Sequence, residues 1–178
     1  MSIYIISDTH FYHTNVIKYC NRPFSDSEEM NNFMIKQWNS VVSNNDTIIH
    51  LGDFGFGNKE QITEICSQLN GNKILIKGNH DLRKGDGFWL DCGFQTVYKR
   101  KQIPLNEIFP EWETDIILSH YPISVEQNQL NIHGHIHNSP LDTTLFKKEN
   151  HICVCVELLD NYKPVNLEKL ILDWRDKK

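Results

Sequence analysis

Residues 2–10 of the chain read SIYIISDTH, a short apolar run that leads directly into an aspartate and a histidine. Isoleucine and tyrosine favour extended backbone, so this run is predicted to form a strand that ends at Asp8. The same order, an apolar run and then polar side chains, recurs in residues 47–53 (TIIHLGD), 73–81 (KILIKGNHD) and 115–120 (DIILSH). Four predicted strands therefore end in side chains that can bind a ligand.

Helical patterns separate the first three of these strands. The first helix is predicted to open at Ser25, with Glu28 three residues later in a capping-box arrangement and apolar side chains at helical spacing after it. The second is predicted to follow Asn58, with Gln61 three residues after this cap. The resulting β-α-β-α-β order favours an α/β fold with a mainly parallel sheet covered by helices.

The second half of the chain carries fewer helical signals. Strands are predicted at residues 94–98 and 152–156, and a closing helix is predicted at residues 166–176. The remaining segments are expected to form further strands and long loops. Hydrophobic spacing alone does not predict how the strands of this half are arranged.

The composition is that of one globular domain. The chain has 178 residues, of which 39% are hydrophobic and 23% are charged, so we expect a single domain over residues 1–178. No stretch approaches the roughly 18 to 20 apolar residues of a membrane span, and no secretion signal precedes the first strand, so we expect a cytoplasmic protein without a membrane partner. The net charge of −5 disfavours duplex nucleic acid as a partner. The five cysteines, an odd number, are expected to be free thiols.

The polar side chains that follow the predicted strands are of types that bind divalent metal ions. Ligands bind at the carboxyl ends of strands in α/β sheets, so residues far apart in sequence are expected to converge there. Residues 133–137 (HGHIH) add a further cluster. Seven candidate ligands result: Asp8, His10, Asp53, Asn79, His120, His135 and His137. Carboxylate, imidazole and amide without thiolate favour Mn, Fe, Zn, Ni or Co, and seven ligands are more than one catalytic ion uses, so two ions are expected.

Five short motifs in a fixed order carry a family resemblance. They are Asp8-Thr9-His10, Gly52-Asp53, Gly78-Asn79-His80-Asp81, His120, and Gly134-His135-Ile136-His137. Each motif alone occurs by chance, but the ordered set after strand-like runs is specific. In this order they resemble the calcineurin-like metallophosphoesterase superfamily, in its small, cap-free bacterial or phage-type form. The resemblance implies a four-layer αββα sandwich of two mixed sheets flanked by helices, with a dinuclear metal site at the carboxyl ends of strands.

The resemblance also implies a role for each of these residues. One ion would be held by Asp8, His10 and His137. The other would be held by Asn79, His120 and His135. Asp53 would bridge the two ions, and His80 would stay off the metals as the catalytic residue that assists the leaving group. The ions would be two divalent transition metals, with Mn favoured over Fe, Zn, Ni or Co, and the reaction would be hydrolysis of a phosphate ester by a metal-bridging hydroxide.

The substrate stays open at this point. A small phosphodiester is favoured because several short, cap-free members of the superfamily act on diesters, and a phosphomonoester (a nucleotide or a phosphoprotein) is the alternative. The protein-phosphatase branch extends the second motif to GDxxDRG, whereas this chain has Phe56 in place of the later aspartate, which disfavours a protein substrate. A non-catalytic metal-binding scaffold is the alternative of another class, although scaffold members tend to lose ligands that are all present here. The sequence does not indicate an oligomeric state.

Several residues beside the motifs are open to two interpretations. His13 and Arg22 are candidate substrate-binding residues together with Asn79 and His80, because a guanidinium can grip a phosphate with two hydrogen bonds. A solvated loop is the favoured interpretation of both His13 and Arg22. Asp81 either orients His80 or caps the following turn. His133 lies outside the GHxH motif and is assigned to structure or to support of the ligands.

Overall fold

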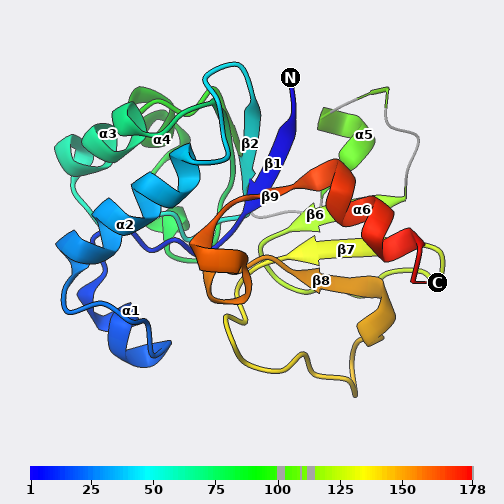
Figure 1. Ribbon diagram of the computed structural model, residues 1–178. Coiled ribbons are helices and arrows are strands. Elements are labelled where there is room, and N and C mark those ends of the chain that lie inside the picture. The colour runs from blue at the N-terminus through cyan, green and yellow to red at the C-terminus, as the bar shows by residue number, and fades with distance from the viewer. Residues whose placement is uncertain (100–102, 109, 112–114, 178) are drawn as a thin grey trace.

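The computed structural model describes residues 1–99, 103–108, 110–111 and 115–177, and it contains two mixed β-sheets with helices around them (Figure 1). The first sheet has the order β4-β3-β2-β1-β9. Its strands are β1 (Ile3–Ile6), β2 (Thr47–His50), β3 (Asn72–Ile76), β4 (Thr96–Tyr98) and β9 (Val165–Asn166). Strands β1 to β4 are parallel, and β9 is antiparallel to β1.

The second sheet is built from the later part of the chain and has the order β5-β6-β7-β8. Its strands are β5 (Ile103–Pro104), β6 (Ile116–Ser119), β7 (Leu130–His133) and β8 (His151–Cys153). Strand β5 is antiparallel to β6, while β6, β7 and β8 are parallel. The α/β fold with two mixed sheets is therefore confirmed, including the second sheet that hydrophobic spacing did not predict.

Six α-helices accompany the sheets in the described part of the chain. They are α1 (Thr14–Tyr19), α2 (Ser27–Asn39), α3 (Lys59–Gln68), α4 (Asp86–Asp91), α5 (Leu105–Ile108) and α6 (Leu167–Arg175). Short 3-10 helices are η1 (Asp81–Arg83), η2 (Lys148–Asn150), η3 (Val156–Leu158) and η4 (Asp160–Tyr162). In the described residues, none of these helices is both long and apolar enough to cross a membrane.

Two apolar cores lie on the two faces of the first sheet. Successive residues of a strand point to opposite faces, so Ile6 and Ile48 pack with side chains of α1 to α4 in one core. Ile5 and Ile49 pack with apolar side chains of the second sheet and of α6 in the other. Figure 1 shows this arrangement, with α2, α3 and α4 on one side of β1 and β2 and the second sheet on the other.

The helix ends confirm one of the two predicted caps, correct the other, and confirm the closing helix. Asn58 caps α3 in a complete capping box with Gln61, and the closing helix begins after its cap Asn166. The first long helix, however, is capped by Asp26 and not by Ser25: the Asp26 side chain accepts from the backbone N–H of Glu29. The prediction was one residue early because serine and aspartate are both good N-caps and stand side by side here.

The predicted strand at residues 152–156 is shorter than expected. Strand β8 ends at Cys153, and η3 begins at Val156. Between them the chain forms an isolated parallel bridge from Cys155 to Ser7, which follows β1. The chain thus passes from the second sheet to the first beside the end of β1.

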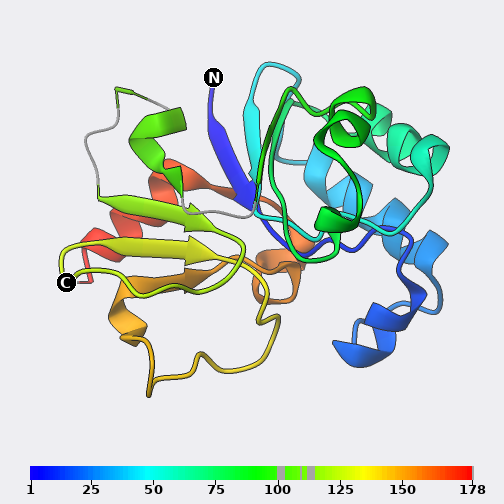
Figure 2. The ribbon, with the colours of Figure 1, turned by 180° about the vertical axis from the view of Figure 1, so that it is seen from behind.

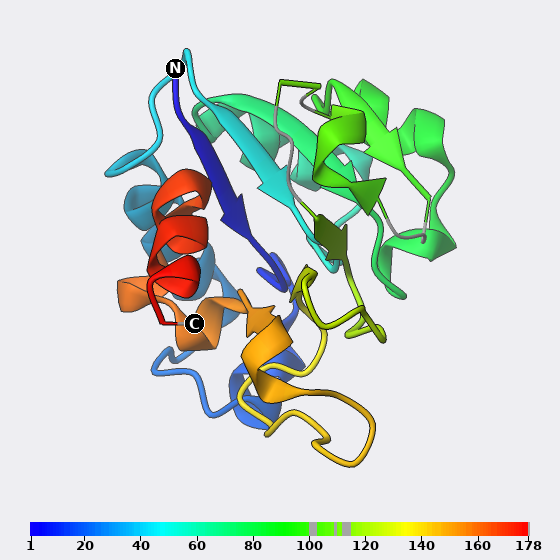
Figure 3. The same cartoon turned by 90° about the vertical axis from the view of Figure 1, so that its right-hand side faces the viewer.

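The carboxyl ends of strands from both sheets meet in one region. In Figure 2 the arrowheads of β6 and β7 point toward the place where β1 ends, and Figure 3 shows β1 and β2 running side by side into it. Backbone hydrogen bonds join the loops there, from Asp8 N–H to the Gly52 carbonyl and from Gly134 N–H to the His120 carbonyl. The residues that follow these strands are therefore brought together by the fold.

Candidate metal centre

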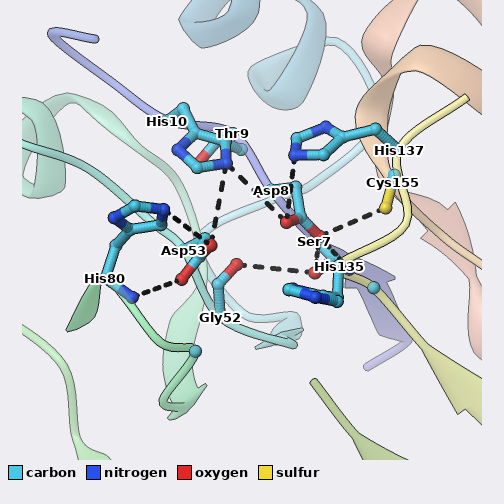
Figure 4. Close-up of polar contacts among 12 residues, drawn as sticks. Ser7, Asp8, Thr9, His10, Gly52, Asp53, His80, His135, His137 and Cys155 are labelled. Atoms are coloured by element: carbon cyan, nitrogen blue, oxygen red, sulfur yellow. Dashed lines mark hydrogen bonds and ion pairs between the residues drawn. The ribbon is translucent and has the colours of Figure 1, made fainter. Parts of the chain in front are cut away.

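All seven predicted metal ligands lie where the strands of the two sheets end. Asp8 and His10 follow β1, Asp53 follows β2, and Asn79 follows β3, whereas His120, His135 and His137 follow strands of the second sheet. Their donor atoms form two groups with Asp53 between them. We call Asp8, His10 and His137 the first ligand group, and Figure 4 shows these three residues with Asp53. We call Asn79, His120 and His135 the second ligand group.

In the first ligand group, three donor atoms face one small space. Asp8 Oδ1 lies 3.7 Å from His10 Nε2 and 3.7 Å from His137 Nε2. Within the described residues, Asp8 Oδ1 and both ring nitrogens of His10 are buried and have no hydrogen-bond partner. The other carboxylate oxygen, Asp8 Oδ2, accepts from Ser7 Oγ, the backbone N–H of His135 and Cys155 Sγ. One oxygen of Asp8 is thus held by the protein and the other is left for a ligand.

In the second ligand group the donor atoms face one another. His120 Nδ1 lies 2.8 Å from the Leu51 carbonyl oxygen, which can only accept, so Nδ1 carries a proton. The other ring nitrogen, Nε2, faces Asn79 Oδ1 at 3.0 Å and His135 Nδ1 at 3.2 Å. An amide oxygen and two imidazole nitrogens, all of which can bind a metal ion, meet at one place. The arrangement therefore favours a bound positive ion.

Asp53 lies between the two groups. Its Oδ2 is 3.6 Å from His120 Nε2 and 3.8 Å from His10 Nε2, so the same oxygen is near a donor of each group. Its Oδ1 accepts from the backbone N–H of His80. A carboxylate in this position can bridge two ions about 3.5 to 4 Å apart.

The pKa shifts in the first ligand group point to a need for positive charge. Burial raises the pKa of the Asp8 carboxyl, but the neighbouring His10 ring and the charges of His120 and His137 outweigh it and hold the pKa well below its usual range. Burial lowers the pKa of His137, but Cys20, Glu157 and Asp8 outweigh it and raise the pKa to about 10. A cation beside Asp8 is thus favoured electrostatically.

The backbone at the ligands is strained. Positive φ angles, which side chains other than glycine rarely adopt, occur at five of the seven ligands. They are Asp8 (59°), His10 (52°), Asp53 (55°), His135 (70°) and His137 (51°). Each such residue costs of order 1–3 kcal/mol, and such strain persists where the surrounding structure over-determines it, as at binding and catalytic sites. The strained backbone and the sequence motifs therefore indicate the same site independently of each other.

Glycine in two of the motifs allows the loops to approach each other closely. Gly52 has a φ of 97°, and a Cβ there would lie 2.8 Å from His120 Nδ1 and 2.7 Å from the Cα of Gly78. A Cβ at Gly78 would lie 2.7 Å from the backbone nitrogen of Asp53. Any larger residue would push the loops that carry Asp53, Asn79 and His120 apart.

His80 lies at the open side of the centre. Its ring is 30% exposed, its Nε2 is 3.8 Å from Asp53 Oδ2, and its Nδ1 is buried without a hydrogen-bond partner among the described residues. Burial, opposed by the charge of Asp53, lowers the pKa of His80. The ring of Phe56 lies 4.7 Å from the His80 ring, so an aromatic contact supports this histidine from the position that is aspartate in the protein phosphatases.

The two remaining substrate-binding candidates have different surroundings. His13 is half-buried, its ring stacks on Phe56 with centroids 3.9 Å apart, and burial together with the charges of His10 and His80 lowers its pKa to about 4. The side chain of Arg22 is fully buried, and its guanidinium donates to Glu157 and to the carbonyls of Asp8 and Thr9. His13 therefore lies beside the ligands, whereas Arg22 lies behind them.

Asp81 has neither of the roles that the sequence left open. Its buried carboxylate accepts from the backbone N–H groups of Asp53, Phe54 and Gly78, and so it ties the loop after β2 to the loop after β3. Burial and the charge of Asp53 raise its pKa to about 8. His133 is also buried, with Nδ1 2.9 Å from the Gly134 carbonyl.

Comparisons with known proteins agree with this geometry. A family model described as calcineurin-like phosphoesterase matches residues 1–176. The chain belongs to this family. It is 39% identical over 176 residues to an uncharacterized protein of Methanocaldococcus jannaschii, covering 95% of this chain and 89% of that protein. It is 28% identical over 173 residues to the gene 66 protein of Mycobacterium phage L5, covering 82% and 83% of the two chains.

A solved structure is also similar along nearly the whole chain. The crystal structure of a protein of unknown function from Aquifex aeolicus matches with a TM-score of 0.70 and 29% identity, covering 96% of this chain and 98% of that one. The resemblance to the calcineurin-like superfamily is confirmed, and membership of the family implies metal-dependent hydrolysis of a phosphate ester. The donor set of this calcineurin-like phosphoesterase fits divalent ions, because carboxylate and imidazole donors converge in the first ligand group and imidazole and amide donors converge in the second. In the first group, the buried Asp8 Oδ1 and the His10 ring nitrogens have no other partner among the described residues.

The sequence motifs missed the residues that hold the ligands in place. Glu157 accepts from His137 Nδ1 at 3.0 Å, and Ser7 and Cys155 hold Asp8 Oδ2. Glu157 stands in none of the five motifs, and Cys155 is predicted from the sequence only as a free thiol. A buried carboxylate next to a ligand is visible only in three dimensions, so no spacing in the sequence could have indicated Glu157.

Proposed function

We propose that this chain hydrolyses a small phosphodiester with the help of two divalent transition-metal ions, of which Mn is favoured. Asp8, His10 and His137 hold one ion, Asn79, His120 and His135 hold the other, and Asp53 bridges them. The observation that carries this proposal is the convergence of buried acceptor atoms on both sides of Asp53 Oδ2. When bound, such ions supply an activated water and neutralise charge on the phosphoryl group.

The side chains of the protein then have three tasks. The two ligand groups fix the spacing of the site on strands of both sheets, which keeps it rigid. Asn79 and His80 lie on the substrate side, and His80 Nε2 holds the proton that the leaving oxygen receives. His13 and Phe56 border His80, and we propose His13 as a further contact for the substrate.

Arg22 is not proposed to bind the phosphate, although its residue type made it a candidate for that role. Its side chain is fully buried and its donors are shared between Glu157 and two backbone carbonyls. These contacts support a role behind the first ligand group and not on the phosphate.

The diester preference rests on the resemblance to short, cap-free members of the family, and the test must separate diester from monoester. Metal-free protein is loaded in turn with Mn, Co, Ni or Zn and assayed with bis(p-nitrophenyl) phosphate and with mono-p-nitrophenyl phosphate. We expect turnover of both, with the diester faster. Faster turnover of the monoester would change the proposed substrate class from a diester to a monoester. No turnover with any metal would leave the non-catalytic scaffold as the remaining interpretation.

A further inference from the structure

A buried ion pair lies directly behind the first ligand group. Arg22 Nη2 and Nε donate to Glu157 Oε1 at 2.6 and 2.9 Å, and the two side chains are 0% and 5% exposed. Removing two charges from water costs several kcal/mol per ion, so a buried pair contributes little or nothing to net stability. Its position next to the ligands suggests another role.

Both members of the pair reach a segment that carries a ligand. Arg22 donates through Nη2 to the carbonyl of Asp8 at 2.7 Å and through Nη1 to the carbonyl of Thr9 at 2.8 Å. Glu157 Oε1 lies 3.0 Å from His137 Nδ1, and because a carboxylate accepts, Nδ1 carries the proton. Nε2 is therefore the ring nitrogen of His137 that faces Asp8 Oδ1, 3.7 Å away, and it is the one that would bind an ion there.

The pair also connects the two sheets. Asp8 and Thr9 follow β1 of the first sheet, while His137 follows β7 of the second, and Figure 4 shows His137 and Asp8 side by side. Asp8 and His137 both have positive φ angles, which each segment alone does not favour. A hydrogen-bonded pair that holds both segments supplies the contacts that keep these conformations.

We propose that Arg22 and Glu157 are positioning residues that set the affinity of the first ligand group for its ion. Glu157 fixes the tautomer and the orientation of His137, and Arg22 fixes the backbone of Asp8 and Thr9. Carboxylates that accept from the distal nitrogen of a metal-binding histidine commonly tune metal affinity by 10- to 100-fold. This inference rests on the proposed two-ion centre.

The residue types match this task. Arg22 uses three nitrogens of a planar fork to reach one carboxylate oxygen and two carbonyl oxygens. Lysine has all its donors on one nitrogen, so it cannot span these three acceptors. Arg22→Lys therefore keeps the charge but loses the geometry.

The same residues admit one competing interpretation. Donor atoms of Cys20, His137 and Glu157 lie close enough together to hold a metal ion of their own. Arg22 argues against this, because its guanidinium already places a positive charge 2.6 Å from Glu157 Oε1. The stoichiometry of metal binding distinguishes the two interpretations.

The test is a titration of metal-free protein with cobalt(II), followed by visible absorption and by competition with a chromophoric chelator. Wild type is expected to bind two ions in two resolvable steps. Glu157→Gln preserves the shape of the side chain and removes its charge, and it is expected to weaken one step by about 10- to 100-fold and leave the other unchanged. Arg22→Lys is expected to weaken the same step. Asp91→Asn, which breaks the exposed pair with Lys59, is the matched control and should leave both steps unchanged.

A second measurement separates positioning from a general loss of structure. In the cobalt protein, the Nδ1–H of His137 is expected to give an exchangeable, paramagnetically shifted proton resonance that disappears selectively in Glu157→Ala. Far-UV circular dichroism of each metal-free variant verifies that it is folded. If Arg22→Lys does not fold, the two Glu157 variants still decide the matter.

The outcomes are distinct. Two unchanged steps and an unchanged resonance in folded Glu157→Gln and Glu157→Ala would overturn the inference and leave the proposed function intact. Three ions bound by wild type and two by Glu157→Ala would overturn it in favour of a metal site at Cys20. A wild-type protein that binds no ion would overturn the proposed function, and this inference with it.

Discussion

The two ligand groups are held in place by different kinds of contact. In the first group, charged and polar side chains hold the ligands: Glu157 holds His137, and the adjacent Ser7 and the distant Cys155 hold Asp8 Oδ2. In the second group, the Leu51 backbone carbonyl holds His120, and Tyr121 donates to Asn79 Oδ1 at 3.2 Å. The first group thus depends on side chains that bridge the sheets, whereas the second depends more on loop backbone.

This difference indicates that the two ions are not equivalent. A ligand held by a backbone carbonyl keeps its orientation as long as the strand end is intact. A ligand held by a buried charged side chain is sensitive to single substitutions, because the loss of one partner leaves an uncompensated charge.

Removal of both ions is expected to have the largest effect. Chelation should lower turnover by at least about 10³-fold, since the activated water and the charge neutralisation both depend on the ions. The fold should persist, because both cores lie away from the ligands and are apolar. Activity and far-UV circular dichroism are measured before and after chelation. Unfolding on chelation would instead assign the ions to the stability of the protein.

Substitution of the shared ligand should affect both groups together. Asp53→Asn removes the charge of the oxygen that lies near His10 and His120. It is expected to lower the affinity for both ions by more than about 100-fold, a larger loss than substitution of a residue that only supports a ligand causes. Metal content per chain after gel filtration is the measurement. If only one ion is lost, Asp53 belongs to one group and does not bridge.

Loss of the proposed proton donor should leave both groups intact. His80→Ala is expected to lower turnover by about 10² to 10⁴-fold without a change in metal content, because the ring lies at the side of the site and is not among the ligands. His151→Ala is the matched control, since His151 lies at the start of β8, at the opposite end from the ligands. Unchanged turnover in His80→Ala would remove this residue from the reaction.

The smallest effects are expected from a matched pair of uncharged partners. Cys155→Ala removes the thiol donor to Asp8 in the first group, and Tyr121→Phe removes the hydroxyl donor to Asn79 in the second. Each substitution is expected to weaken the binding of one ion by about 1 kcal/mol, a roughly fivefold loss of affinity, because this is the net contribution of one hydrogen bond. Stepwise cobalt titration measures both. If each variant weakens the same step, the division into two ligand groups is wrong.

The first half of the fold could be predicted well from local patterns. Strands β1, β2 and β3 and helix α3 lie within two residues of their predicted places, because short apolar runs and the Asn58–Gln61 capping box are local signals. The order of the second sheet could not be predicted in this way. Strand β5 has two residues, too few for a periodic pattern, and in β7 only Leu130 and Ile132 alternate with polar residues before the histidine cluster begins.

The side chains at the strand ends can be read from the sequence, and they indicate the family and the seven candidate ligands, because ligand chemistry is a property of residue types. How these side chains are held cannot be read from it and follows from the folded arrangement. The positive φ angles, the three backbone donors on Asp81 and the Arg22–Glu157 pair all depend on segments far apart in the chain. Arg22 and Glu157 are 135 positions apart, so the physical reason is that long-range contacts, unlike turns and caps, leave no local signature in the sequence.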